Sequence, residues 1–312
     1  MTLTQLRYIL AVDRCRNFGE AARECFVTQP TLSMQIHKLE DYLQIQIFDR
    51  TKTPTEPTAL GKKVLERARK LVLEADALEE LGMSLRKEMK GEFSLAVIPT
   101  LAPYLIPLFA EKFVKMYPQV KLKVFEYQTH EIISLLKEDK IDGAILATPL
   151  EEKGLKEEFL FYEPFELFFS PKHELLKKKQ IDDKDLDSSE AWLLKEGHCL
   201  RAQALQLCHV NHQSTKKNLY FEAGSLETLI QMVKNGDGFT FLPELCSHQM
   251  SAADQKNLRP FKSFVPVREI SFVTGPFAIK LSIQDGLIEM IKKQLPDHLK
   301  KAPKKAEVLG IG

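Results

Sequence analysis

The stretch TQPTLSMQIHKLEDYL, residues 28–43, combines a helix start signal with an amphipathic repeat. Thr28 is a favourable N-cap residue, and Pro30 suits the first turn of a helix. Four aliphatic residues then recur at three- or four-residue spacing: Leu32, Ile36, Leu39 and Leu43. This spacing predicts a helix that buries one stripe and turns its other side chains outward.

Two further helices are expected upstream, over residues 4–12 and 18–25, and the second contains the small pair Ala21-Ala22 that permits close helix crossing. Two helices joined by a tight turn, the second presenting small polar and basic groups, are typical of a helix-turn-helix. The outward residues that could reach base edges or phosphates are Gln29, Pro30, Thr31, Ser33, Met34 and Lys38. Met34 could contact a thymine methyl group.

A small β-wing is predicted over residues 45–52, where the sequence alternates before two prolines. Its cations, Arg50 and Lys52, are candidates for contacts with backbone phosphates or a narrow minor groove, although they could also be ordinary solvated loop charges. Residues 1–70 carry twelve lysines and arginines against eight aspartates and glutamates. We therefore expect residues 1–57 to form an all-α winged helix-turn-helix that meets an anionic partner.

A long helix is predicted over residues 58–90. Small and apolar residues alternate along it at four- and three-residue spacing: Val64, Ala68, Leu71, Ala75, Leu78, Gly82, Leu85 and Met89. That spacing is typical of a coiled-coil seam, so we expect this linker helix to mediate dimerisation.

Strands and helices alternate from residue 91, and their βαβα order up to residue 146 predicts a parallel sheet covered on both faces. Further strands and a closing helix continue this α/β region to about residue 300. The region is too long for one small α/β unit, so we expect two lobes with a cleft. Lobe I would comprise about 91–163 and 267–300, and lobe II about 164–266. The lysine-rich tail, residues 301–312, is predicted to be disordered.

The chain of 312 residues has no apolar run of membrane-spanning length and no secretory signal pattern. These features predict a cytoplasmic protein without a membrane partner, whose five cysteines rest as thiols. Neither cysteines nor histidines show zinc-finger spacing, so no metal site and no cofactor is expected. Core packing is the expected role of Cys15 and Cys25, while Cys246 has no assigned role.

The segment from Ala21 to Leu43 closely resembles the winged helix-turn-helix of LysR-type transcriptional regulators. Phe48-Asp49-Arg50 and Thr58-Ala59-Leu60-Gly61 match the same family. The resemblance implies a bacterial regulator with a two-lobed effector domain similar to periplasmic binding proteins. Its implied partners are double-stranded promoter DNA, RNA polymerase and further copies of itself, as a dimer and then a tetramer.

A narrower resemblance, to the peroxide-sensing members of that family, rests on Gly197-His198-Cys199-Leu200-Arg201 with Cys208. Ser225-Leu226-Glu227-Thr228-Leu229 and Ile98-Pro99-Thr100 support it. The resemblance implies that hydrogen peroxide oxidises Cys199 to a sulfenic acid, which Cys208 then converts into a disulfide. It also implies the residues that would surround the peroxide: Thr100, Thr129, His198 and Arg268.

Three points remain open in this comparison. Arg268 could as easily be a surface charge, and Cys199 and Cys208 could be small buried hydrophobes without redox function. The chain also departs from the peroxide-sensing pattern, with Ala202 where an acidic residue is usual and Thr274-Gly275 in place of a Tyr-Arg pair. The change at position 202 could alter how quickly the cysteine segment rearranges.

The spacing of the two cysteines restricts how they can react. In a helix, nine residues separate them by roughly 13 Å along the axis and place them on opposite faces. A disulfide requires Cα atoms within about 7 Å, so oxidation would have to refold the segment from about Gly197 to Val210.

Three functions remain possible. The first is a transcription factor that senses peroxide through Cys199 and Cys208 and activates peroxide-defence genes. The second is a LysR-type regulator that binds a small organic anion while its cysteines stay inert. The third is a thiol-dependent peroxidase, against which the helix-turn-helix argues because a turnover enzyme has no use for it.

Overall fold

The computed structural model describes residues 1–85, 89–208, 221–276 and 278–311, and of residues 79–81, 83–85 and 208 it describes the backbone alone. The chain forms two compact units, residues 1–88 and 89–312. Among the described residues, none of the helices is long and apolar enough to cross a membrane.

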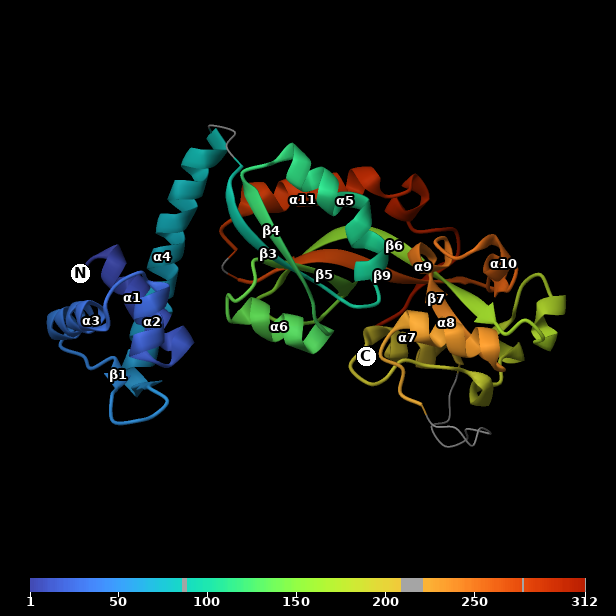
Figure 1. Cartoon of the computed structure of the whole chain (residues 1–312), viewed down its shortest axis with the longest axis horizontal. Coiled ribbons are helices and arrows are strands. Elements are labelled where there is room, and N and C mark those ends of the chain that lie inside the picture. Colours follow the sequence, from blue (N-terminus) through green and yellow to red (C-terminus); the bar gives the residue numbers. More distant parts are fainter. Residues whose placement is uncertain (86–88, 209–220, 277, 312) are drawn as a thin grey trace. The chain divides into compact units, whose positions relative to one another are not determined.

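The N-terminal unit contains the three expected helices, α1 (Leu3–Cys15), α2 (Phe18–Glu24) and α3 (Gln29–Leu43) (Figure 1). Each has a side-chain N-cap, which for α3 is the predicted Thr28. The stripe predicted on α3 is confirmed, since Leu32, Ile36 and Leu39 are fully buried and Leu43 packs against the same core. This packing fixes which face of α3 remains outside.

Two short antiparallel strands, β1 (Phe48–Asp49) and β2 (Glu56–Pro57), follow α3 at the position of the predicted wing. The long helix α4 (Ala59–Leu85) follows Thr58, whose hydroxyl accepts a hydrogen bond from the amide of Gly61 at 2.8 Å. Gly61 is required here because a Cβ atom would lie 2.0 Å from the carbonyl oxygen of Ile47. The close approach holds the start of α4 against the strand-loop segment before the wing.

The apolar residues of α4 do not all face the same surroundings. Ala68, a member of the predicted seam, is buried in the core of the N-terminal unit together with Leu65 and Val72. Leu71 and Leu78, also seam residues, are 48% and 70% exposed. The first turns of α4 thus complete the helix-turn-helix core, and apolar side chains of the seam remain uncovered beyond them.

The C-terminal unit is built on one continuous sheet with the strand order β4-β3-β5-β9-β6-β7, while β10 pairs with β9 and β8 with β6. The strands are β3 (Gly91–Val97), β4 (Val120–Glu126), β5 (Gly143–Thr148), β6 (Lys156–Phe169), β7 (Phe239–Pro243), β8 (Leu258–Arg259), β9 (Val265–Thr274) and β10 (Ala306–Val308). The strands β3, β4 and β5 are parallel to one another, but β9 is antiparallel to β5 and to β6. The predicted parallel sheet is confirmed for β3, β4 and β5. The sheet as a whole is mixed, because β6 and β9 are long neighbouring strands that run in opposite directions.

The pairing partners of β6 change along its length. Residues up to Pro164 pair with β9, and residues from Phe165 onward pair with β7 and β8. The strands β6 and β9 thus join the part of the sheet made by β3, β4 and β5 to the part made by β7 and β8. Buried side chains from both parts form one continuous core.

Helices cover both faces of the sheet (Figure 1). The α-helices of this unit are α5 (Ala102–Met116), α6 (Thr129–Lys137), α7 (Cys199–Cys208), α8 (Leu226–Asn235), α9 (Glu244–Ser247), α10 (Ala252–Gln255) and α11 (Leu281–Gln294). Short 3₁₀ turns occupy Glu174–Lys177, Asp183–Asp185, Ser188–Glu190 and Asp297–Lys300. The helices α5 and α11 lie along one face of the sheet, and α6 lies on the opposite face.

The prediction of a disordered C-terminal tail is wrong. Residues 306–308 form β10, which pairs with β9, and Leu309 is 4% exposed. The amide of Leu309 donates to the carbonyl of Val267 at 2.9 Å, which continues the pairing. The lysines that suggested disorder precede an apolar run, and that run supplies the burial that holds the tail in place.

Candidate functional site

Cys199 is the first residue of α7 and is only 7% exposed. Gly197 precedes it with φ of +91°, and a Cβ atom at Gly197 would lie 2.3 Å from Oε1 of Gln128. Glycine is therefore needed at position 197 for two reasons, the left-handed backbone and the close approach to the segment before α6. This turn sets the start of α7 against the start of α6.

Three kinds of group stabilise the thiolate form of Cys199. The positive charge of Arg268 lies nearby, the Thr129 side chain forms a hydrogen bond with the sulfur, and the backbone amide of Leu200 contributes another. Burial nevertheless raises the pKa of the Cys199 thiol above its ordinary value, and these groups only oppose that rise. The resting site therefore holds a protonated thiol, whereas the reactive form with peroxide is the thiolate.

Arg268 is fully buried, so the interpretation of this residue as a surface charge is wrong. Its guanidinium donates to the hydroxyl of Thr100 at 2.9 Å and to the carboxylate of Glu163 at 2.8 Å. The structure thus brings Thr100, Thr129 and Arg268 together around Cys199. Thr100 follows β3 and Thr129 begins α6 after β4, at the carboxyl ends of two parallel strands.

Glu163 is a residue of this site that sequence reasoning missed. It lies opposite Arg268 in the antiparallel β6–β9 pairing, is fully buried, and accepts a hydrogen bond from the amide of Leu245 at 3.1 Å. Burial raises the pKa of Glu163, while the charge of Arg268 acts in the opposite direction. The available signal was a carboxylate set among the apolar residues of β6, because a buried charge requires a partner.

His198 is 6% exposed, and its Nε2 atom has no hydrogen-bond partner among the residues that the structure describes. Burial, and secondarily the charge of Lys195, lowers the pKa of this imidazole. A neutral His198 is therefore expected near pH 7, with one ring nitrogen able to donate and the other able to accept a hydrogen bond.

Cys208 is the last residue of the same ten-residue helix, α7. Nine helical steps separate the two backbones by roughly 13 Å along the axis, as the spacing predicted. The Cys208 side chain and residues 209 and 210 lie outside the described residues. In the resting helix the cysteine backbones are thus too far apart for a disulfide.

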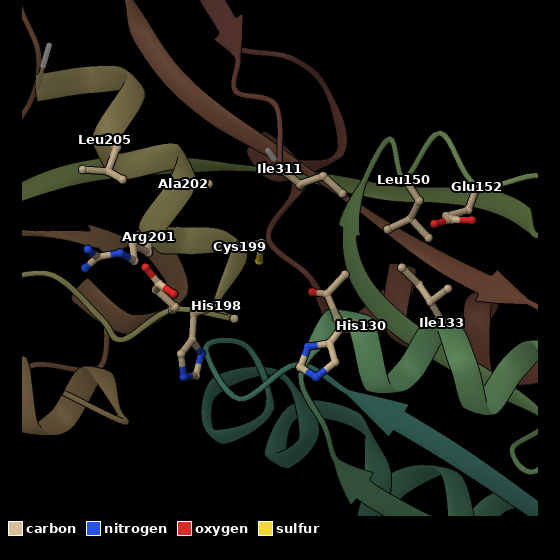
Figure 2. Close-up of a pocket in the computed structure, with 13 residues that line it drawn as sticks. His130, Ile133, Leu150, Glu152, His198, Cys199, Arg201, Ala202, Leu205 and Ile311 are labelled. Carbon is tan, nitrogen blue, oxygen red and sulfur yellow. The ribbon is translucent and has the colours of Figure 1, made fainter. Parts of the chain in front are cut away.

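A cavity of about 480 Å³ opens beside Cys199 (Figure 2). Residues from α6, α7, the preceding loops and the C-terminal tail line it: Thr129, His130, Ile133, Leu150, Glu152, Glu196, Gly197, His198, Cys199, Arg201, Ala202, Leu205 and Ile311. Three of the six predicted redox and peroxide-binding residues are not part of this lining. Thr100 and Arg268 are buried, and the Cys208 side chain lies outside the described residues. Thr129, His198 and Cys199 face the cavity directly.

Cys246, which had no predicted role, lies in α9 and is 2% exposed. It contacts the hydroxyl of Tyr104, which donates to the carboxylate of Glu227 at 2.6 Å. Burial raises the pKa of Cys246 to about 12, so this thiol is unreactive at neutral pH. Within the described residues, no group of three or more histidine, cysteine or acidic side chains could hold a metal ion.

On the helix-turn-helix, the predicted DNA-contacting residues of α3 lie outside the core, with Ser33 half-buried and the others exposed: Gln29, Pro30, Thr31, Met34 and Lys38. The two wing cations are engaged within the chain. Arg50 donates to Ser33 and pairs with Glu40 at 3.2 Å, and its guanidinium lies 5.0 Å from the ring of Phe18. Lys52 pairs with Glu56 at 2.6 Å.

An N-terminal helix-turn-helix followed by an α/β sensing domain with a buried thiol defines a class of DNA-binding regulators. Residues 3–62 match the helix-turn-helix of bacterial regulatory proteins of the lysR family, and residues 86–294 match the LysR substrate binding domain. The chain belongs to the LysR family of transcriptional regulators, and it is accordingly a regulator rather than an enzyme.

The similar proteins come from several bacteria. The chain is 33% identical to the hydrogen peroxide-inducible genes activator of Dickeya chrysanthemi, over 96% of this chain and 98% of that protein. It is also 33% identical to the DNA-binding transcriptional dual regulator OxyR of Escherichia coli, over 98% and 100%. The structure of a full-length OxyR variant from Pseudomonas aeruginosa superposes with a TM-score of 0.74 at 31% identity, covering 94% of this chain and 98% of that one.

Proposed function

We propose that this protein is a transcriptional activator that senses hydrogen peroxide through Cys199 and switches on oxidative-defence genes. The proposal rests on the surroundings of the Cys199 thiol, where the Thr129 side chain and the Arg268 charge lie beside the sulfur. Cys199 is the first residue of α7, and Cys208 is the last residue of the same helix. The peroxide-related names of the relatives support it.

The proposed chemistry begins when Cys199 loses its proton and the thiolate attacks one oxygen of hydrogen peroxide. The O–O bond breaks, and the departing hydroxide takes up a proton to leave as water, while Cys199 becomes a sulfenic acid. Hydrogen-bond donors and a positive charge stabilise both the thiolate and the leaving oxygen. Thr100, Thr129, His198 and Arg268 supply this environment in our proposal.

In the second step, the thiol of Cys208 attacks the sulfenic sulfur and releases a second water, which leaves a Cys199–Cys208 disulfide. This step cannot occur while α7 keeps its shape, because its length exceeds the reach of a disulfide. We infer that oxidation refolds the segment of about residues 197–210. The altered surface of the two-lobed, periplasmic-binding-protein-like effector domain would then change the spacing of the DNA-binding domains.

The remaining parts of the proposal concern partners. The winged helix-turn-helix would bind promoter DNA through α3 and the wing, and the linker helix α4 would mediate dimerisation, with two dimers forming a tetramer. Activation would proceed through contact with RNA polymerase in the cytoplasm. The exposed seam residues Leu71 and Leu78 support the role of α4 in self-association.

The experiment compares the wild type with Cys199→Ser in a reporter assay and in DNA binding. We expect Cys199→Ser to abolish the transcriptional response to hydrogen peroxide while the affinity for promoter DNA, and its decrease with salt, is retained. A response that persists in Cys199→Ser would overturn the proposal and favour a regulator with inert cysteines. Cys246→Ser is the matched control, because its buried thiol is expected to have no part in the response.

A further inference from the structure

A second cavity lies in the C-terminal unit, and the chemistry proposed for Cys199 does not use it. Its volume is about 510 Å³, within the range of about 300–1,000 Å³ that is typical of sites for small organic molecules. It has no lining residue in common with the cavity beside Cys199. Its walls come from β6, from α9, from residues 260–266 at the start of β9, and from residues 298–303 before β10.

Aromatic and proline side chains make up most of these walls: Pro164, Phe165, Pro260, Phe261, Phe264, Pro266 and Pro303. The ring of Phe261 lies 6.4 Å from that of Phe241 and 5.4 Å from that of Phe264, measured between centroids. Phe264 is only partly buried, so its ring presents apolar surface to the cavity. Such walls favour a ligand that is itself flat and aromatic, because aromatic rings pack well against one another.

Charged side chains of both signs also line the cavity, and the first of them, Glu244, already has partners. Its carboxylate is hydrogen-bonded to Nε2 of His298 and lies 3.6 Å from Nε2 of His248. These three side chains therefore satisfy one another and do not require a ligand.

Glu166 and Lys301, in contrast, each retain an unused polar group at this cavity. Atom Oε2 of Glu166 accepts a hydrogen bond from the Ser247 hydroxyl, and Oε1 has no partner in the part of the chain that the structure describes. The ammonium of Lys301 forms neither a hydrogen bond nor an ion pair with any described residue. One carboxylate oxygen and one ammonium group thus remain available to a ligand.

This combination of charges identifies the class of ligand. An ammonium group on the ligand would pair with Glu166, and a carboxylate on the ligand would pair with Lys301. The aromatic walls would hold a ring. A free amino acid with an aromatic side chain carries these three groups on one small skeleton, whereas a simple anion or cation would leave one of the two protein charges unpaired.

Phe165 connects the second cavity to the reactive thiol. Its ring lines the cavity, and the guanidinium carbon of Arg268 lies 5.8 Å from the centroid of that ring, a distance suited to a cation–π interaction. Arg268 is the charge that stabilises the thiolate of Cys199. A ligand in the second cavity would therefore contact the side chain that helps to hold this charge in position.

We propose that the second cavity binds free aromatic amino acids through Glu166, Lys301 and the aromatic walls, and that binding accelerates the oxidation of Cys199. A ligand packed against Phe165 restrains the Arg268 charge, and a restrained charge stabilises the thiolate and the leaving oxygen more effectively. The regulator would then respond to amino acid availability as well as to peroxide. Only the effect on Cys199 rests on the proposed function, since the binding site itself does not depend on it.

Isothermal titration calorimetry of the full-length reduced protein tests the binding site with three probes that differ in their charged groups. L-Tryptophan carries both charges, indole-3-propionate lacks the ammonium group, and tryptamine lacks the carboxylate. Lys301→Gln and Glu166→Gln each remove one protein charge, and the amide at position 166 can still accept the hydrogen bond from Ser247. Lys304→Gln is the matched control, because it removes an exposed lysine of the same segment that does not line the cavity.

We expect L-tryptophan to bind with a dissociation constant of about 1 mM or lower, and the other two probes to bind about tenfold more weakly. Lys301→Gln should weaken the binding of tryptophan about tenfold and leave that of tryptamine unchanged. Glu166→Gln should weaken the binding of tryptophan to the same extent and leave that of indole-3-propionate unchanged. Lys304→Gln should change none of these affinities.

The effect on Cys199 is measured in the Cys208→Ser background, where the sulfenic acid formed by hydrogen peroxide can be trapped and quantified by mass spectrometry. Saturating tryptophan should raise the rate constant of its formation about threefold, a fraction of what a cation–π contact contributes. The same concentration should give a smaller increase when Lys301→Gln is added, and the full increase when Lys304→Gln is added.

The binding site is overturned if tryptophan does not bind, or if it binds equally well to Lys301→Gln and Glu166→Gln. An affinity for indole-3-propionate or tryptamine equal to that for tryptophan would contradict an amino acid as the ligand. If tryptophan binds as expected but leaves the oxidation rate unchanged, the coupling is overturned and the proposed function stands. If hydrogen peroxide does not oxidise Cys199 at all, the proposed function fails, while calorimetry still decides the binding site.

Discussion

At the scale of single residues, the central feature is the buried ion pair of Arg268 and Glu163 next to the Cys199 thiol. Arg268 cannot be near Cys199 without a counter-charge, because an isolated buried guanidinium is very unfavourable. Glu163 supplies that charge from the neighbouring strand and is itself held by the amide of Leu245. We regard Glu163 as a positioning residue, since it holds Arg268 and does not itself reach the cavity.

This role predicts the effect of Glu163→Gln. Removing one partner of a buried ion pair should lower the free energy of unfolding by about 3–5 kcal/mol and slow the oxidation of Cys199. Urea unfolding and sulfenic acid trapping measure the two effects. Glu158→Gln, on the same strand but with a half-exposed side chain paired to Lys292, should change stability by no more than about 0.5 kcal/mol. Equal effects of the two substitutions would contradict the assignment.

The raised pKa of Cys199 predicts how its oxidation depends on pH. Because the thiol is protonated at rest and only the thiolate reacts, the thiolate fraction should grow about tenfold per pH unit below the pKa. Sulfenic acid formation in Cys208→Ser should therefore accelerate continuously from pH 6 to pH 8. A rate that is constant over this range would mean that the thiolate already exists in the resting protein.

At the scale of elements, α7 is held by the C-terminal tail. The carboxamide of Gln203 donates to the carbonyl of Leu309 at 3.3 Å, and that of Gln206 donates to the carbonyl of Gly310 at 3.1 Å. Figure 1 shows the C-terminus beside α7. The helix α7, which must unfold on oxidation in our account, is thus stabilised by hydrogen bonds to the C-terminal tail, about one hundred residues further along the chain.

Leu309→Ala tests this arrangement. The substitution removes a buried side chain next to the Gln203 contact, which typically costs 2–5 kcal/mol, so α7 should open more readily. Amide hydrogen exchange of the reduced protein should show faster exchange in residues 199–207. Glu307→Ala, at an exposed position of β10, should leave exchange unchanged. If Leu309→Ala also leaves it unchanged, the tail does not hold the helix.

Local patterns predicted some elements well and others poorly. The cap at Thr28 and the stripe on α3 were readable because both depend on residues within a few positions of each other. The order of the tail depends on distant contacts of Leu309, and the direction of β9 depends on pairing with β6, so neither follows from local spacing. The same distinction applies to the residues of the site. Family resemblance predicted Thr100, Thr129 and His198 near Cys199. Glu163 becomes recognisable only through its pairing with Arg268, which depends on the arrangement of two strands.

At the scale of the whole molecule, signal transfer requires more than one copy of the chain in our account. The linker helix offers a surface for this purpose, since the early residues of its seam pack within the chain and Leu71 and Leu78 remain exposed. Leu71 and Leu78 are seven residues apart and therefore lie on the same face of the helix, where a second copy of α4 could cover them.

Leu78→Glu should therefore weaken self-association, because it places a charge where two copies of α4 would meet. We expect the dissociation constant from sedimentation to rise at least about tenfold. Glu74→Ala changes an exposed charge on the same helix and should have little effect. Unchanged association of Leu78→Glu would show that the copies meet elsewhere.

The central claim is that Cys199 and Cys208 can join only if α7 unfolds. The most direct measurement combines non-reducing peptide mapping with amide hydrogen exchange of residues 199–207, before and after one equivalent of hydrogen peroxide. We predict a Cys199–Cys208 disulfide together with a loss of exchange protection along α7, and neither change in Cys199→Ser. A disulfide between these residues with protection of α7 intact would contradict the account.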